Sequence, residues 1–174
     1  MKLKTITLGI ILSVMSSTAF AADGYKNVKF GSSVETVLAS KLCSLKKYKS
    51  DTHGMDSYAC RDFMFSGKPT LAMAIFLNGK FQRFAISINT SVTPILEGLT
   101  KKYGPASSAS TAEEMDRAAV TGDSIFVRFD NDTVFVQGNK NLSTGKDDGL
   151  LVYTTPQYDK ELLALQAKSL GNDL

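Results

Sequence analysis

Residues 70–89 read Thr-Leu-Ala-Met-Ala-Ile-Phe-Leu-Asn-Gly-Lys-Phe-Gln-Arg-Phe-Ala-Ile-Ser-Ile-Asn, two apolar runs separated by an Asn-Gly pair. Asn-Gly is the strongest two-residue signal for a β-hairpin, because both turn positions need a positive φ. Pairing outward from this turn predicts strands over 70–78 and 81–89, with Phe76 opposite Phe81 and Met73 opposite Phe84. Alternation then gives one apolar face, the predicted core face, which carries Leu71, Met73, Ile75, Phe84, Ile86 and Ile88.

A third strand is predicted over 58–65, ahead of this hairpin. A four-residue connection between the two places Cys60 opposite Ile75, on the core face. The same register puts Asp62 opposite Met73, also on the core face. Because a buried, unpaired carboxylate is costly, this strand has either a bulge at Asp62 or a different register.

A helix is predicted before this strand. Ser32 and Glu35 fit a capping box, and apolar residues follow at helical spacing to about Leu45. A helix lying over the core face brings Cys43 close to Cys60, so we expect these cysteines to form a disulfide. Two buried free thiols are the alternative interpretation.

The second half of the chain has a similar order of elements. Pro94 and Gly104 mark the two ends of one helix, and Thr111 with Glu114 predicts a shorter helix to about Val120. The predicted strands cover 124–129, 133–138 and 150–155, and a last helix covers 157–170.

Residues 28–89 and 92–155 therefore share an α-β-β-β plan, without evident sequence identity between them. This order predicts an α+β fold in which helices pack on antiparallel sheet. A chain of 174 residues, 43% of them hydrophobic, is long enough for one core. We expect residues 22–174 to form a single domain.

The N-terminus has the pattern of a secretory signal peptide. Lys2 and Lys4 precede an apolar stretch over 6–15, and Ala19 and Ala21 form an Ala-x-Ala cleavage site. The apolar stretch is too short for a membrane anchor, which needs about 20 residues. We therefore expect cleavage after Ala21 and export to the periplasm, with secretion beyond it left open. An oxidising compartment also favours the disulfide.

Cleavage also changes the charge of the protein. The chain has 20 Lys+Arg against 17 Asp+Glu, a net charge of +3, and loss of Lys2 and Lys4 leaves 18 against 17, or +1. Because nucleic-acid binding depends on many Lys and Arg contacts to phosphates, a nearly neutral protein argues against nucleic acid as a partner. Basic residues gather early in the chain and acidic ones over 113–132, which favours one charged patch facing a protein partner.

No pattern in the sequence assigns an enzymatic activity. His53 is the single histidine and lies in a polar stretch, so neither a zinc site nor a Ser-His-Asp relay is predicted. The acidic groups around Asp130 and Asp147 lack the spacing of a calcium-binding loop. We therefore predict no catalytic residue, no metal site and no cofactor.

The second face of the predicted sheet carries the candidate binding residues. Aromatic and arginine side chains alternate there with small alanines, and a four-residue turn at Asp130 places a similar set in the second half. Arginine and aromatic residues are enriched at the energetic centres of protein interfaces. The candidate partner-binding residues are Arg61, Phe63, Phe76, Phe81, Arg83, Phe126, Arg128 and Phe135. They form either a concave protein-binding surface or an internal core.

Three short motifs accompany this layout: Gly-Ser-Ser-Val-Glu-Thr-Val at 31–37, Lys-Lys-Tyr-Gly-Pro at 101–105 and Tyr-Thr-Thr-Pro at 153–156. With the repeated α-β-β-β plan, the chain resembles the β-lactamase-inhibitor-protein-like fold and the small BamE (SmpA/OmlA) envelope proteins. It differs from the lipoprotein members because it has no lipobox cysteine. The resemblance implies a non-enzymatic protein that binds another protein.

We therefore expect a periplasmic protein-binding module without a stable membrane anchor, such as an inhibitor or immunity protein directed at an envelope toxin or enzyme. The alternative is a small-ligand carrier with a cavity around Tyr58, Met73 and Phe84. The two functions require different structural features. A binding module needs an accessible face, and a carrier needs an apolar hollow.

Overall fold

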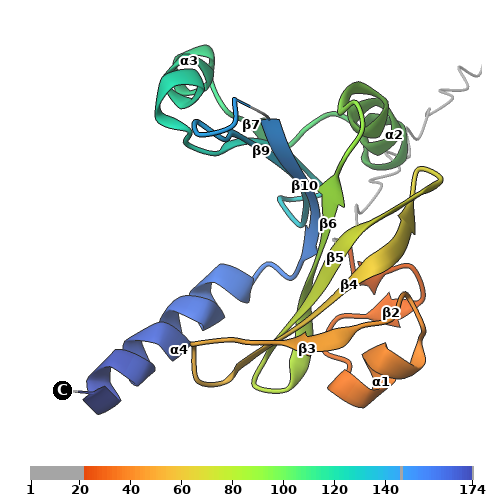
Figure 1. The fold of residues 1–174 in the computed structure, drawn as a ribbon, viewed down its shortest axis with the longest axis vertical. Coiled ribbons are helices and arrows are strands. Elements are labelled where there is room, and N and C mark those ends of the chain that lie inside the picture. The colour runs from red at the N-terminus through yellow and green to blue at the C-terminus, as the bar shows by residue number, and fades with distance from the viewer. Residues whose placement is uncertain (1–21, 146, 174) are drawn as a thin grey trace, which may run out of the picture.

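The computed structural model describes residues 22–145 and 147–173, so the predicted signal peptide, residues 1–21, lies outside the described residues. The described part of the chain contains an eight-stranded antiparallel sheet with the order β3-β4-β5-β6-β10-β9-β8-β7 (Figure 1). Its strands are β3 (Lys46–Tyr48), β4 (Met55–Phe65), β5 (Lys68–Leu77), β6 (Lys80–Ile88), β7 (Ser108–Ala109), β8 (Ile125–Phe129), β9 (Val134–Lys140) and β10 (Asp147–Thr154).

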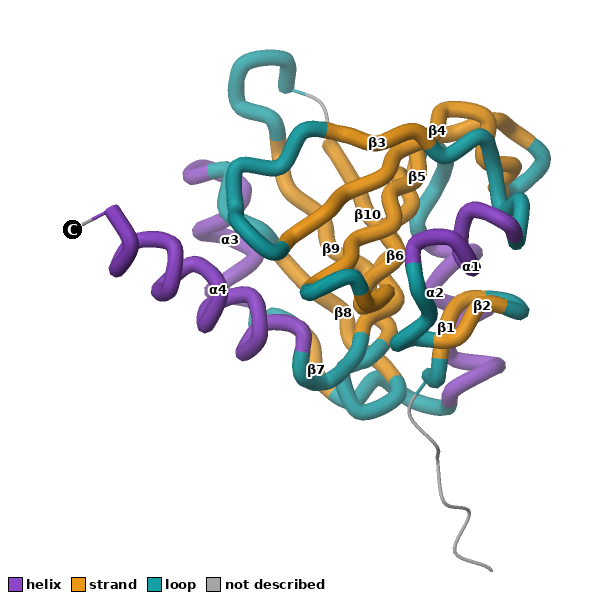
Figure 2. The backbone as a smooth tube through the Cα atoms, turned by 90° about the horizontal axis from the view of Figure 1, so that it is seen from below, coloured by secondary structure: helices purple, strands orange, loops and turns teal. Residues whose placement is uncertain are grey.

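Helices and a small hairpin lie on the two sides of this sheet. They are the hairpin β1 (Gly24–Tyr25) and β2 (Val28–Lys29), and the helices α1 (Val34–Ala39), α2 (Thr93–Tyr103), α3 (Ala112–Thr121) and α4 (Tyr158–Asp173). Figure 2 shows α1, α2 and the β1–β2 hairpin on one side of the sheet and α4 on the other. The predicted α+β fold with a C-terminal helix is confirmed, and the short strands β3 and β7 are added at the sheet edges.

The two halves join through the last strand of each. The meander β4-β5-β6 meets the meander β8-β9-β10 where β6 pairs with β10, with Phe84 opposite Tyr153 and Ile86 opposite Leu151. These four side chains belong to one cluster of buried residues that continues across the junction. The repeated plan therefore produces one sheet with one core.

A β-bulge changes the register predicted for the central hairpin. Phe76 pairs with Phe81 as predicted, but Ile75 pairs with Arg83, so Gln82 is an extra residue in β6. A bulge of this kind reverses the alternation of side chains along its strand. Phe81 and Phe84, three residues apart, both face the core as a result.

The bulge is held by the residue that follows β10. The backbone carbonyl of Gln82 accepts the N–H of Thr155 at 2.9 Å, and the Thr155 hydroxyl donates to the Gln82 side-chain oxygen at 2.5 Å. Ala74, and not Met73, therefore lies opposite Phe84. The predicted core positions of Leu71, Met73 and Ile75 are wrong, and these residues lie on the other side of the sheet.

The predicted register places Asp62 on the core face, and a second bulge, in β4, explains why the residue does not lie there. Cys60 pairs with Ala72, and not with Ile75, and the register shifts immediately after Cys60. The bulge leaves Asp62 exposed, where its two oxygens accept the backbone N–H of Ser44 at 3.1 and 3.2 Å. These hydrogen bonds hold the pKa of the Asp62 carboxyl below its ordinary value.

The predicted disulfide between Cys43 and Cys60 is confirmed, with 6.2 Å between the two Cα atoms. Cys43 does not lie on the helix, however, because α1 ends at Ala39 and not near Leu45. Lys41 has a positive φ of 53°, which turns the chain away from the helix axis. The disulfide therefore joins β4 to the loop that follows α1.

The two predicted capping boxes differ in outcome. The cap of α1 is Ser33, one residue later than predicted, and its hydroxyl accepts the N–H of Thr36 at 3.3 Å. At α3 the box is formed as predicted, since the Thr111 hydroxyl accepts the N–H of Glu114 and the Glu114 carboxylate accepts the N–H of Thr111. Capping satisfies backbone donors that the first helical turn leaves unpaired.

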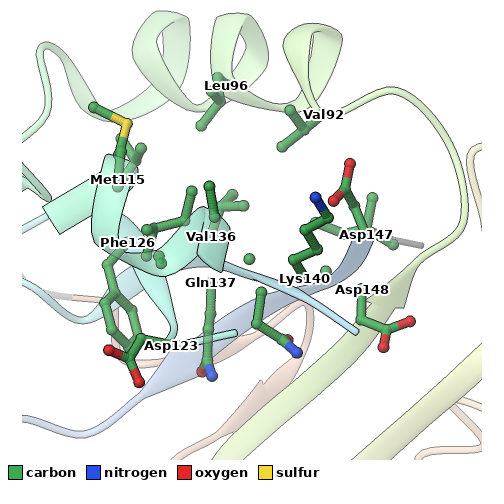
Figure 3. Close-up of a pocket in the computed structure, with 18 of the residues that line it drawn as sticks. Val92, Leu96, Met115, Asp123, Phe126, Val136, Gln137, Lys140, Asp147 and Asp148 are labelled. Atoms are coloured by element: carbon green, nitrogen blue, oxygen red, sulfur yellow. The ribbon is translucent and has the colours of Figure 1, made fainter. Parts of the chain in front are cut away.

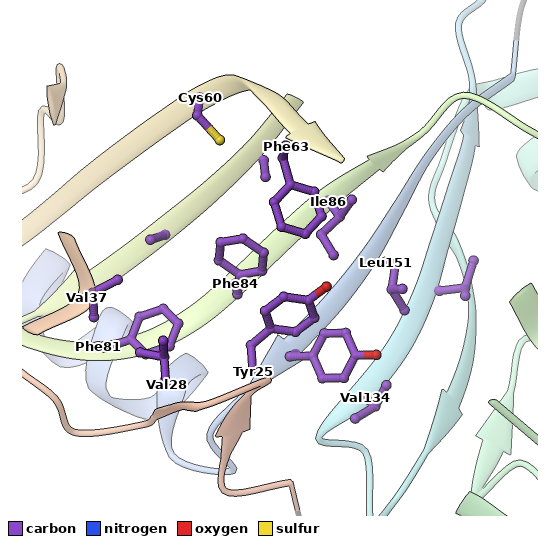
Figure 4. Close-up of a cluster of buried hydrophobic side chains, with 14 of the residues drawn as sticks. Tyr25, Val28, Val37, Cys60, Phe63, Phe81, Phe84, Ile86, Val134 and Leu151 are labelled. Atoms are coloured by element: carbon purple, nitrogen blue, oxygen red, sulfur yellow. The ribbon is translucent and has the colours of Figure 1, made fainter. Parts of the chain in front are cut away.

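The core lies between the sheet, the β1–β2 hairpin, α1 and α2 (Figure 4). Tyr25 from β1 stacks on Phe84, with ring centroids 4.6 Å apart, and touches Tyr153 at 4.9 Å. The largest fully buried aromatic side chains are Phe63, Phe76, Phe81, Phe84 and Phe129. Of the two interpretations of the candidate binding residues, the internal core holds for Phe63, Phe76 and Phe81 and the binding face is wrong for them, because the two bulges place them in this core.

Candidate functional site

The side of the sheet opposite this core, which we call the open face, is the first candidate site. In the described part of the chain, α4 is the helix that packs on this side, against β5. One row of paired residues crosses five strands of the face. From β5 to β8 the row is Met73, Ala85, Val152, Phe135 and Arg128.

Arg83 on β6 joins the open face to the start of α4. Its guanidinium carbon lies 3.5 Å from the ring centroid of Tyr158 and 5.7 Å from that of Phe135. Its Nη2 forms an ion pair with Asp159 at 3.0 Å, and its Nε donates to the Thr154 hydroxyl at 3.0 Å. Burial lowers the pKa of Arg83, while Tyr158 and Asp159 oppose this effect. The polar groups of Arg83 are engaged within the protein.

Arg128 on β8 has a different environment. Its guanidinium carbon lies 4.2 Å from the ring centroid of Phe126 and 6.0 Å from that of Phe135, and the two rings meet edge to face at 6.0 Å. Within the described residues, Arg128 forms no ion pair. A stacked guanidinium keeps its five N–H donors available in a fixed plane, suited to a carboxylate.

The structure therefore brings together half of the predicted binding residues: Arg83, Phe126, Arg128 and Phe135. Arg61 is exposed in the β4 bulge and borders a separate hollow of about 650 Å³ with Leu71 and Met73. Sequence reasoning missed Tyr158 and Asp159, which contact Arg83. The sequence did place Tyr158 at the start of the predicted last helix. Helical spacing does not specify where that helix packs on the sheet, so the contact with Arg83 could not be derived.

The second candidate site is a groove between α2, α3 and the sheet, which we call the α2–α3 groove (Figure 3). Its volume is about 790 Å³, and Leu96, Met115, Ile125 and Val136 contribute apolar walls. Gly138 and Gly149 pair across β9 and β10 in its floor. Because glycine has no side chain, this pair leaves space where the neighbouring strands carry apolar residues.

The rim of the α2–α3 groove is polar and mostly acidic. It carries Asp123, Asp147, Asp148 and Lys140. The sequence predicted a carrier cavity elsewhere, around Tyr58, Met73 and Phe84. That position is wrong, because Phe84 is fully buried in the core and Met73 lies on the open face.

The structure also places the histidine and the two cysteines, the other residues that could take part in a metal site. His53 is exposed in the turn before β4. Cys43, Cys60 and Asp62 bring possible ligand atoms within 4.8 Å of one another, but both sulfurs are used in the disulfide. In the described ranges no helix is both long and apolar enough to cross a membrane.

Comparison with known proteins assigns the chain to a family. A family model described as an uncharacterised protein matches residues 25–173. The chain belongs to this family. A similar protein from Haemophilus influenzae, also described as uncharacterized, is 32% identical over 177 residues and is covered in full, as is this chain. No solved structure matches. The family region includes the sheet, the open face and the α2–α3 groove.

Proposed function

We propose that the chain is a non-enzymatic, periplasmic protein-binding module that uses its open face to bind an acidic segment of another exported protein. The observation that carries the proposal is Arg128, stacked on Phe126 beside Phe135 and without an ion pair in the described part of the chain. The signal-like N-terminus and the disulfide support the periplasmic location.

The charge and the apolar surface of the open face favour a partner protein that carries carboxylates beside an apolar patch. Arg128 offers a planar set of donors at one end of the cross-strand row, and Met73 and Leu150 offer half-buried apolar surface along the face. Arginine and aromatic residues dominate the binding energy of many interfaces. An inhibitor or immunity role follows if the bound segment belongs to the active region of a toxin or enzyme.

Site-specific crosslinking tests this proposal. We expect benzoylphenylalanine at Gln137, next to Phe126 on the open face, to crosslink in the periplasm to one protein of defined mass. Arg128→Glu should reduce the crosslinked product about 30-fold, the loss typical of an interface hot spot. Lys168→Glu, the same change in charge on an exposed part of α4, should leave it unchanged.

Two outcomes would contradict the proposal. One is the absence of a crosslinked partner from Gln137. The other is a partner that is captured equally well from Lys26, on the exposed turn of the β1–β2 hairpin, or that is unaffected by Arg128→Glu.

The α2–α3 groove supports a second function, a carrier of small ligands. Its volume of about 790 Å³ lies within the usual range of ligand pockets, and its walls are mainly apolar. The rim acids favour a ligand with an apolar body and a cationic group. Phe126 and Gln137 lie at the border of both sites, but the glycine floor of the groove is separate from Arg128, so variants at Gly138 and at Arg128 test the two proposals separately.

Filling the groove tests the carrier function. Gly138→Leu should abolish any ligand mass that co-purifies with the protein in native mass spectrometry, because a Cβ at Gly138 meets Ile125 at 3.6 Å and the added atoms enter the groove. Gly98→Leu is the matched control, since Gly98 is exposed and a Cβ there meets no atom within 4 Å. Retention of the ligand by the Gly138→Leu protein would rule out this groove as the binding site.

A further inference from the structure

The turn between β8 and β9 buries a carboxylate. Asp130 is 8% exposed, and Thr133 is fully buried. The Thr133 hydroxyl lies 2.7 Å from the backbone carbonyl of Asp130 and 2.9 Å from its Oδ2. The Thr133 carbonyl also accepts the N–H of Thr154 at 2.9 Å. The carboxylate is therefore fixed by its own turn and by β10.

The backbone nitrogen of Ala22 also lies at this carboxylate. It lies 2.5 Å from Oδ2 of Asp130 and 3.3 Å from the Thr133 hydroxyl oxygen, across 108 residues of sequence. Within residues 22–145 and 147–173, no lysine, arginine or histidine side chain forms an ion pair with Asp130. A buried carboxylate without a cation is destabilising.

The arrangement of acceptors fits an ammonium group better than an amide. An amide nitrogen has one proton, but two oxygen acceptors converge on Ala22. An α-ammonium has three protons and a positive charge, so it serves both acceptors and neutralises Asp130. Ala22 is also the residue that follows the predicted Ala-x-Ala cleavage site.

We propose that Asp130 and Thr133 form a receptor for the N-terminal ammonium of the processed chain, created when a signal peptidase hydrolyses the bond between Ala21 and Ala22. In this step the bond between the Ala21 carbonyl carbon and the Ala22 nitrogen breaks, and the hydroxyl of a water molecule joins the carbonyl carbon. The Ala22 nitrogen takes the second water proton and the proton released by the new Ala21 carboxyl group. The products are a peptide carboxylate and an Ala22 ammonium.

Neighbouring contacts hold Ala22 at this receptor. The carbonyl of Asp23 accepts the N–H of Phe30 at 2.8 Å, which closes the base of the β1–β2 hairpin. Tyr25, three residues from Ala22, is stacked on Phe84 in the core. Because these contacts already order the segment, the ion pair forms with little further loss of conformational entropy. Cleavage therefore completes the fold as well as releasing the protein.

A double-mutant cycle tests the receptor. Four forms of the chain are compared by urea unfolding: the chain that starts at Ala22, the same chain with Ala21 retained, and each with Asp130→Asn. The form starting at Ala22 should have an unfolding equilibrium constant about 10- to 100-fold lower than the extended form, as for a charge-assisted hydrogen bond. In the Asp130→Asn background this difference should vanish. Equal stability of the first two forms, or a difference that persists with Asp130→Asn, would overturn the proposal.

Amine labelling provides a test that does not depend on the folding of a variant. The α-amine of the exported wild-type protein should react with an N-hydroxysuccinimide ester at neutral pH at least about tenfold more slowly in the folded state than in urea, because an ion-paired ammonium is not nucleophilic. Mass spectrometry of the N-terminal peptide measures the rate and identifies Ala22 as the first residue. Equal labelling rates, or a different first residue, would contradict the receptor.

Discussion

Phe84→Ala is expected to lower the free energy of unfolding by about 3–5 kcal/mol, the range for removing a large buried aromatic side chain. The ring is fully buried and contacts Tyr25 at 4.6 Å, Phe63 at 5.4 Å and Phe81 at 6.5 Å between centroids. Tyr25 comes from β1, Phe63 from β4 and Phe81 from β6 itself, so the cavity opens where the N-terminal hairpin meets the sheet. Urea unfolding followed by circular dichroism measures the loss.

A matched control separates burial from loss of side-chain volume. Met64 on β4 is 58% exposed, and Met64→Ala should change stability by no more than about 0.5 kcal/mol. Phe84→Leu keeps much of the buried volume, so its loss in free energy of unfolding should lie between those of Phe84→Ala and Met64→Ala. If Phe84→Ala unfolds at the same urea concentration as the wild type, Phe84 does not face the core and the bulge at Gln82 is misplaced.

That bulge also explains why the first half of the sheet was predicted less well than the second. In β8 and β9, the predicted four-residue turn and unbroken alternation were sufficient, because Phe129 pairs with Val134 across residues 130–133. In β6 the extra residue, Gln82, is stabilised by Thr155, 73 residues away. Local alternation contains no information about such a partner, and a shift of one residue exchanges the two faces of a strand.

The same shift accounts for the candidate site. Phe126, Arg128 and Phe135 come from the half whose register was correct, and they lie together on the open face. Phe76 and Phe81 come from the other half and lie in the core. The ion pair between Arg83 and Asp159 depends on where α4 docks, which helical periodicity alone does not specify.

The α2–α3 groove depends on long-range pairing in the same way. Gly138 ends one predicted strand and Gly149 precedes the next, which was predicted to begin at Leu150, and their effect appears only when β9 and β10 place them side by side. Sequence spacing predicts that the strands exist. The relative register across the intervening loop decides whether the two glycines fall together, and this register is set by pairing with the rest of the sheet.

Loss of the disulfide is the second large effect that we expect. In the chain-entropy description, a crosslink between residues 17 apart stabilises the folded state by roughly 3 kcal/mol, because it restricts the unfolded chain. Here Cys43 follows α1 and Cys60 precedes the β4 bulge, so the bond attaches the first helical region to the sheet. The hydrogen bonds from Ser44 to Asp62 lie beside the disulfide, but they are exposed and contribute much less to stability.

The double variant Cys43→Ala with Cys60→Ala should therefore unfold at a clearly lower urea concentration than the oxidised wild type, by roughly 3 kcal/mol in free energy. Alanine is preferred to serine because Cys60 is 5% exposed, and a buried hydroxyl would add a separate penalty. The wild type reduced with dithiothreitol is the matched comparison, and it should agree with the double variant within about 1 kcal/mol. A wild type whose unfolding midpoint does not change on reduction would contradict this prediction, because the crosslink would then contribute nothing to the attachment of the first helical region.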